Sequence, residues 1–379
     1  MDSTQPLPLL GGLSAAQFMR RYWQKKPLLV RGAVPRMMPP LARAELFALA
    51  AEEGVESRLI RQQSKGGWTL RHGPFARRAL PATTQAGWTL LVQGVDLHHD
   101  AAHALLRQFS FIPDARVDDL MISYASDGGG VGPHFDSYDV FLLQVAGRRR
   151  WSIGRQSDLR LQPDVPLKVL QNFEPEDSWV LAPGDMLYLP PRYAHDGVAL
   201  GGDCMTCSIG LRSPEKSHLA ADLLARMAEA HGEAAQDAPV ERRVHYRDAR
   251  QPAVAAPAAM PAALRAYARE AVEAALRDAD IVDRALGESM TEPKANVWFE
   301  PGAAPENWQG VRLDRRTRML YDERHIYING ESFRAGGRDA TLMRKLADQR
   351  RLEAGDLRKA SDDALELMGD WAEAGWLHG

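Results

Sequence analysis

Cysteine is scarce in this chain of 379 residues, which contains only Cys204 and Cys207. A disulfide framework is therefore excluded, and a reducing, cytoplasmic location is expected, since no signal-peptide pattern precedes the first domain. The C-x-x-C spacing invites a zinc or redox interpretation, but no second C-x-x-C supplies further ligands. Both residues lie in a strand-like segment, 203–209, where positions three apart point to opposite faces. We therefore interpret them as two buried thiols.

Long apolar runs and an excess of one charge are also missing. No run of about 18 apolar residues occurs, so a membrane-spanning helix is excluded. The 47 Lys and Arg against 50 Asp and Glu give a formal net charge of −3. This balance argues against a protein that coats nucleic acid electrostatically, and it would suit a basic partner better. With 45% hydrophobic residues, the chain has enough apolar surface to fold into an ordered core.

Short strand-like runs alternate with turns in residues 1–212, the first of three predicted parts. A capping box, from Ser14 to Gln17, starts a helix near the N-terminus. Short antiparallel strands at this spacing predict a barrel or jelly roll. The predicted strands are 28–30, 120–125, 140–145, 149–153, 179–181, 186–189 and 205–211.

Residues 213–294 have the pattern of a helical region. A helix is predicted from 213–215, with Gly232 as its C-terminal cap. An Ala- and Pro-rich connector follows over 235–263, and then a second amphipathic helix over 262–279. Two such helices between larger domains often form a dimer interface, so a homodimer is expected, although packing within one chain is nearly as common.

Residues 295–379 are predicted to form a small winged-helix-like domain. Strand patterns at 318–321 and 325–328, an Asn329-Gly330 turn and two helical segments suggest this α+β module. Winged helices often bind DNA, but this part holds 13 Lys and Arg against 15 Asp and Glu. Its net charge of −2 argues against DNA binding. The fold class is therefore α+β and multidomain.

The chemistry-bearing residues follow the glycine-rich segment 128–133. On a strand, His134 and Asp136 project from the same face, so both side chains can reach one ion. A third ligand, His195, follows a segment at 184–190 that resembles the second cupin motif, with Arg192 where that pattern usually has Gly. Two imidazoles and one carboxylate form the facial triad of non-haem Fe(II) oxygenases, which leaves positions for a 2-oxo acid and O2. Ordinary polar strand residues, or a metal site without catalysis, remain alternatives.

A second His-x-Asp tripeptide, from His98 to Asp100, tests how specific this spacing is. It leads into a helical pattern over 101–106, and residues two apart on a helix do not share a face. We therefore expect no chelate at His98.

Arg149 is the predicted anchor for a co-substrate. Strand alternation places it on the same face as Trp151 and Ile153, opposite to Arg148 and Arg150. A guanidinium on an apolar face needs a partner, and the distal carboxylate of 2-oxoglutarate would bind it bidentately. An internal salt bridge is the alternative.

Several segments together resemble the bacterial JmjC-type ribosomal oxygenases. They are 118–123, 128–136, 138–141, 148–151, Trp23, Lys26-Pro27, Arg31-Gly32 and Pro190-Pro191 ahead of His195. The resemblance implies a double-stranded β-helix of the cupin or JmjC type, a helical dimerisation region and a C-terminal winged helix. It also implies an Fe(II)- and 2-oxoglutarate-dependent hydroxylase that uses O2, releases succinate and CO2, and modifies an arginine Cβ in large-subunit ribosomal protein number sixteen. In this family's pattern His134, Asp136 and His195 would bind iron, and Arg149, Ser123 and Ser208 would hold 2-oxoglutarate.

A substrate guanidinium would need carboxylates and an aromatic face near the metal. Asp127 and Tyr138 are the candidates by proximity in sequence, and Asp139 and Asp196 are alternatives. Residue spacing does not report the substrate side chain, so a histidyl or lysyl hydroxylase remains open. A non-enzymatic cupin sensor is a third hypothesis, which the inward Arg149 disfavours.

Overall fold

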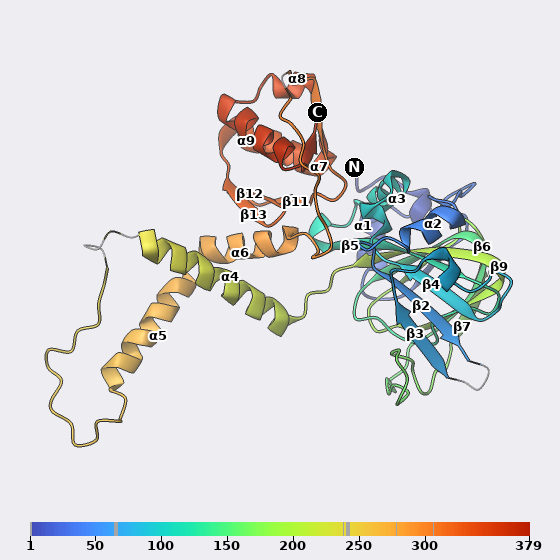
Figure 1. The fold of residues 1–379 in the computed structure, drawn as a ribbon, viewed down its shortest axis with the longest axis horizontal. Helices are drawn as coiled ribbons and strands as arrows, with labels where there is room; N and C mark the ends of the chain where they lie inside the picture. Colours follow the sequence, from blue (N-terminus) through green and yellow to red (C-terminus); the bar gives the residue numbers. More distant parts are fainter. Residues whose placement is uncertain (1, 64–66, 238, 240–242, 278, 306) are drawn as a thin grey trace. The chain divides into compact units, whose positions relative to one another are not determined.

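The computed structural model describes residues 2–63, 67–237, 239, 243–277, 279–305 and 307–379 (Figure 1). The predicted connector 235–263 and the predicted helix 262–279 each include positions outside these ranges. The chain forms two units, one of Met1–Ser213 with Ala295–Trp298 and one of Pro214–Lys294 with Phe299–Gly379. Each unit has its own apolar core.

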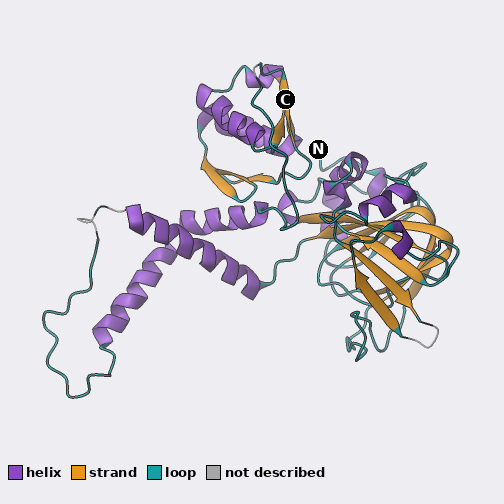
Figure 2. Ribbon diagram, in the orientation of Figure 1, coloured by secondary structure: helices purple, strands orange, loops and turns teal. Residues whose placement is uncertain are grey.

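A nine-stranded antiparallel sheet forms the first unit and curls into a barrel (Figure 2). The strand order is β1-β8-β6-β9-β5-β4-β2-β3, and β7 pairs with β6. This arrangement confirms the predicted jelly-roll class. The strands are β1 Leu28–Val30, β2 Ser57–Gln62, β3 Trp68–His72, β4 Trp88–Val92, β5 Val117–Ala125, β6 Val140–Gly154, β7 Asp177–Leu181, β8 Met186–Leu189 and β9 Ala194–Leu211.

Three features of the sheet differ from the sequence-based expectation. The segments predicted as separate strands, 140–145 and 149–153, are one long strand, β6, because Gly147 forms a bulge and not a hairpin turn. Gly147 has a φ of 61°, and a Cβ on it would lie 2.9 Å from the backbone of β9. Strand β9 begins at Ala194, well before the predicted strand 205–211, and strands β2 to β4 were not predicted.

The two faces of the sheet bury different cores. One apolar cluster of β6 to β8 side chains lies on the face that carries Trp151 and Ile153. The other face packs against the helices α1 (Ala15–Arg21), α2 (Arg43–Leu49) and α3 (Asp100–Leu106). Helix α1 starts with the predicted capping box, in which Ser14 and Gln17 bond reciprocally.

Cys204 and Cys207 are free and buried on β9, and they belong to different apolar clusters. This placement confirms the interpretation as two buried thiols on opposite faces. Burial raises the pKa of the Cys207 thiol, which makes it a poor nucleophile.

Three long helices start the second unit: α4 Lys216–Asp237, α5 Ala262–Arg277 and α6 Ala279–Thr291. The prediction that a helix ends at Gly232 is wrong, because the Ala-rich residues that follow continue α4 for five more positions. Helix α6 was not predicted as a separate element. Within the residues described, no helix is long and apolar enough to cross a membrane.

The remainder of the second unit is the small α+β module. The Asn329-Gly330 turn has φ angles of 47° and 91°, as its sequence predicted. Its elements are β10 Gly310–Leu313, β11 Met319–Tyr321, β12 His325–Ile328, β13 Glu331–Arg334, α7 Gly337–Gln349, β14 Arg351–Glu353, α8 Ala354–Leu357, α9 Asp362–Glu373 and β15 Leu377–His378. Short 3-10 helices of the first unit are η1 Pro8–Leu10, η2 Arg77–Ala79, η3 Val95–Leu97, η4 Arg107–Phe109 and η5 Asp114–Arg116.

Candidate metal centre

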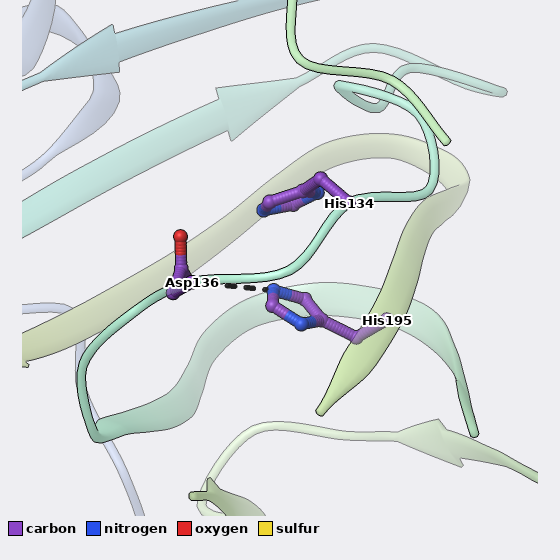
Figure 3. Close-up of side chains that lie close together, drawn as sticks. All are labelled: His134, Asp136 and His195. Carbon is purple, nitrogen blue, oxygen red and sulfur yellow. Dashed lines mark ion pairs between the residues drawn. The ribbon is translucent and has the colours of Figure 1, made fainter. Parts of the chain in front are cut away.

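The side chains of His134, Asp136 and His195 lie close together (Figure 3). Each offers one ligand atom, and these atoms all lie within 4.8 Å of one another. His195 lies on β9. The sequence had suggested a strand for His134 and Asp136 as well, but both lie in the loop between β5 and β6. An isolated bridge replaces the expected strand, because the backbone N–H of His134 donates to His195 O at 2.9 Å and the return bond measures 2.8 Å.

Both imidazoles are oriented by backbone carbonyls. Nδ1 of His134 lies 2.9 Å from Gly132 O, and Nδ1 of His195 lies 2.9 Å from Tyr193 O. A proton on each Nδ1 satisfies these contacts and leaves both Nε2 lone pairs free to bind a metal. Nε2 of His195 lies 3.7 Å from Oδ2 of Asp136. Burial, and then the neighbouring His134, lower the pKa of His195, so its neutral, ligating form is favoured.

The ligand-bearing loop is held from two sides. Gly132 has a φ of 80°, and a Cβ on it would lie 2.9 Å from the Trp68 ring. On the other side, the Arg192 N–H donates to Asp136 O at 2.7 Å. Arg192 occupies the position where the cupin pattern has Gly, and it adopts the left-handed backbone that glycine would favour, with a φ of 64°.

The second His-x-Asp tripeptide forms no such centre. His98 ends η3, and Asp100 begins α3. Across the described ranges, the triad is the single group of three or more His, Cys, Asp or Glu side chains close enough to share an ion.

Arg149 is buried on the face of β6 that points towards the triad. It is 4% exposed, whereas Arg148 and Arg150 are exposed, which agrees with the predicted alternation. Ile153 shares its face and lies opposite His195 in the register of β6 and β9. Nε and Nη2 of Arg149 have no hydrogen-bond partner among the described residues. Its guanidinium carbon lies 5.6 Å from the Trp151 ring centre, and no acidic residue in the described chain forms the alternative salt bridge.

Ser123 and Ser208 lie on β5 and β9, on the interior face of the barrel. Both are buried, and the Ser123 hydroxyl donates to Thr206 O at 3.4 Å. Sequence reasoning missed two polar neighbours on this face, Gln144 and Thr206, whose side chains are joined by a 2.8 Å hydrogen bond. The only available signal was that Gln144 continues the period of two set by the inward residues of β6.

The four candidates for substrate contacts lie in different environments. The Asp127 carboxylate accepts a 2.7 Å hydrogen bond from the Gly201 N–H and so ties the loop after β5 to strand β9. Tyr138 is 39% exposed, and burial of its hydroxyl, followed by the charge of Asp136, raises its pKa. Asp139 is fully buried and accepts hydrogen bonds from Tyr188 at 2.6 Å and Gln24 at 2.9 Å, so its carboxylate is occupied within the fold. Asp196 is partly buried, and burial raises its pKa.

Known proteins are similar to this chain along nearly its whole length. A JmjC-domain model matches residues 104–219, and a ROXA-like winged-helix model matches residues 274–378. The crystal structure of Escherichia coli YcfD is 30% identical with a TM-score of 0.81, and the match covers 97% of this chain and 98% of that one. The chain belongs to the JmjC-domain ribosomal oxygenases. This membership confirms the resemblance inferred from the motifs.

Two curated relatives of this ribosomal oxygenase are similar over its first half. The ribosomal protein uL16 3-hydroxylase of Escherichia coli K12 is 41% identical over 208 residues, which are 55% of each chain. A probable ribosomal oxygenase of Haemophilus influenzae is 38% identical over 205 residues, which are 53% of this chain and 50% of that one. The sequence alignments therefore span about half the length of these relatives. A YcfD structure with cobalt and 2-oxoglutarate matches with a TM-score of 0.79 and 30% identity over 96% of this chain and 97% of that one.

The residues present in this ribosomal oxygenase fit both iron and 2-oxoglutarate. Two Nε2 atoms and one carboxylate are the donor set expected for non-haem Fe(II) with open coordination positions. Nε and Nη2 of the buried Arg149 guanidinium lack hydrogen-bond partners, and a carboxylate would satisfy them.

Proposed function

We propose that the chain is an Fe(II)- and 2-oxoglutarate-dependent hydroxylase that acts on an arginine Cβ of ribosomal protein uL16. The observation that carries this proposal is the unpartnered, buried Arg149 on the same barrel face as the His–Asp–His triad. A passive metal site has no need for an unneutralised guanidinium, because burying an unpaired charge is costly. The substrate assignment is supported by the relative from Escherichia coli whose name is ribosomal protein uL16 3-hydroxylase.

Each functional side chain has a defined role in this proposal. His134, Asp136 and His195 hold Fe(II), and the Gly132 and Tyr193 carbonyls keep both rings in the ligating tautomer. Arg149 binds the distal carboxylate of 2-oxoglutarate, and the hydroxyls of Ser123 and Ser208 contribute further donors. When bound, iron with 2-oxoglutarate and O2 supplies the oxidising power for hydroxylation, with succinate and CO2 as co-products. The protein keeps the site dry and positions the C–H bond.

Tyr138 and Asp127 are proposed to contact the substrate arginine. The half-exposed Tyr138 ring offers an aromatic face beside Asp136, which suits a guanidinium. Asp127 is exposed, and its Oδ1 accepts from Gly201, so an approaching cation would use its other carboxylate oxygen.

A homodimer through the helical region, residues 213–294, is part of the proposal, as is the division of the chain at 212 and 294. Leu264, Val272 and Leu276 on α5 are 37–60% exposed, and their spacing in multiples of four places them on one helical face. Such an uncovered apolar stripe favours association with a second copy. A cytoplasmic location is proposed from the ribosomal substrate.

The proposal is tested by incubating the protein with Fe(II), 2-oxoglutarate, air and a uL16 peptide, followed by mass spectrometry. The expected result is a gain of about 16 Da on arginine that requires all components and is lost in Arg149→Ala. Succinate formation without modification of that peptide would retain the oxygenase and replace the substrate, with histidyl or lysyl side chains next in line. Neither product from iron-loaded, folded protein would favour the sensor hypothesis.

A further inference from the structure

One margin of the catalytic barrel is basic, although the chain as a whole is weakly acidic. Residues 57–95 contain six Lys and Arg and no Asp or Glu. This stretch forms β2, β3, η2 and β4, and β3 is the edge strand of the sheet (Figure 1). Lys65 lies outside the described residues, and the five arginines lie within them.

Three of these arginines form a stripe on the outer face of the sheet margin. In the register of β2 and β3, Leu59 lies opposite Arg71 and Thr69 lies opposite Arg61, so Arg61 and Arg71 share a face and are diagonal neighbours. The Arg71 guanidinium lies 5.5 Å from the Phe75 ring centre, and that of Arg77 lies 5.2 Å from the Phe47 ring centre. These aromatic contacts orient the charged groups while leaving their N–H edges exposed.

The stripe is not neutralised within the fold. Among the described residues, Arg61, Arg71, Arg77 and the adjacent Arg78 form no ion pair, and all four are exposed. By contrast, Arg107 on the same unit is paired with Asp114 at 2.8 Å. The positive potential of the stripe is therefore available to an anionic partner.

The same hairpin adjoins the metal centre. Trp68 starts β3 on the inner face of the sheet, and its ring packs against Gly132, two residues before the ligand His134. The outer arginines therefore lie on the opposite face of the same hairpin whose inner face packs against the loop of His134 and Asp136.

We propose that the stripe Arg61, Arg71 and Arg77 binds the phosphodiester backbone of RNA that accompanies the protein substrate. This proposal rests on the proposed function, because a ribosomal protein works bound to RNA. A protein partner would need apolar anchors, and none of the described residues between 57 and 95 is an exposed large hydrophobic side chain. A polyanion needs only unpaired cations, and arginine forks match phosphate oxygens well.

Fluorescence anisotropy with a labelled single-stranded RNA of about 20 nucleotides tests the proposal directly. The wild-type protein should bind it, with an affinity that falls steeply with salt. The triple variant R61Q/R71Q/R77Q should bind the RNA at least tenfold more weakly at about 50 mM salt. The slope of log Kd plotted against log salt concentration should be lower by about 2, because each of the three lost phosphate contacts contributes roughly 0.7. Thermal unfolding of the variant checks that it is folded.

The matched control removes three exposed arginines from the second unit, as R312Q/R338Q/R351Q. It changes the net charge equally and should leave RNA affinity within twofold of the wild type. Equal losses in both triple variants, or no RNA binding by the wild-type protein, would overturn the proposal. Polyglutamate that competes as well as the RNA would assign the stripe to an acidic protein instead.

Failure of this inference is separable from failure of the proposed function. Hydroxylation of the isolated uL16 peptide should be unchanged in R61Q/R71Q/R77Q, because none of the three arginines belongs to the metal centre. Modification of the same protein substrate bound to its RNA should be reduced. RNA binding itself is measured without iron or turnover, so its result does not depend on whether the proposed hydroxylase activity is correct.

Discussion

Replacing Arg149 with methionine should stabilise the protein in the absence of 2-oxoglutarate. The buried guanidinium has two donors, Nε and Nη2, without hydrogen-bond partners among the described residues. Each unsatisfied buried donor destabilises the fold by about 1–3 kcal/mol. Loss of the Arg149–Trp151 contact offsets about 1 kcal/mol of the stabilisation that removing these donors gives. Methionine fills a similar volume without a charge, so the net gain is about 1–5 kcal/mol. At roughly 2–4 °C per kcal/mol for a unit of this size, the Tm rises measurably.

The same substitution should abolish stabilisation by the co-substrate. At about 100 times its Kd, 2-oxoglutarate stabilises the wild-type protein by about 2.7 kcal/mol, and it should leave Arg149→Met unchanged. Differential scanning calorimetry with and without 2-oxoglutarate, in the presence of Mn(II), measures both effects. Arg150→Met, which changes an exposed residue on the same strand, should behave like the wild type. A destabilised Arg149→Met that still responds to 2-oxoglutarate would refute the reasoning.

Three further perturbations probe the ligand loop and the barrel. Gly132→Ala should weaken Mn(II) binding at least tenfold in calorimetric titrations, because a Cβ there meets the tryptophan of β3. Gly12→Ala, with a similar φ of 82° but open space around it, should leave metal affinity intact. His134→Ala should eliminate Mn(II) binding while His98→Ala preserves it, and equal losses would contradict the assignment of the triad. Asp185→Asn should cost about 2 kcal/mol in urea unfolding at pH 7. Burial raises the pKa of Asp185, but two backbone N–H donors and a half-exposed arginine outweigh burial, so the pKa is lowered. The ionised Asp185 therefore stabilises the fold above about pH 4, and the stability deficit of Asp185→Asn shrinks as the pH falls below that. A deficit that persists at pH 2 would argue against an ionised role.

The sequence predicted which three side chains come together better than it predicted the elements that carry them. The period of two in strands correctly placed Arg149 inward, because a half-buried strand has a simple relation between position and face. The same rule assigned His134 and Asp136 to a strand, yet they lie in a loop whose shape depends on Gly132 and on the Arg192 N–H. These contacts join segments about 60 residues apart, so no local pattern reports them.

Other differences have similar physical causes. Segments 140–145 and 149–153 were predicted as separate strands, but the long register of β6 with β9 joins them through a bulge at Gly147. Gly232 indicated a helix end, but a glycine in an alanine-rich helix costs only about 1 kcal/mol and does not stop it. Asp139 was a candidate for substrate binding on proximity alone, and its burial against Tyr188 became apparent only in the fold.

The central claim, that this ribosomal oxygenase couples oxidation of 2-oxoglutarate to hydroxylation of uL16, is tested most directly by stoichiometry. Succinate and hydroxylated arginine are quantified in the same reaction as the uL16 concentration is varied. One succinate should form for each hydroxylated arginine at saturating substrate, and both products should be absent in His134→Ala. Hydroxylated arginine that forms without 2-oxoglutarate, or succinate whose formation is unaffected by uL16 that stays unmodified, would contradict the claim.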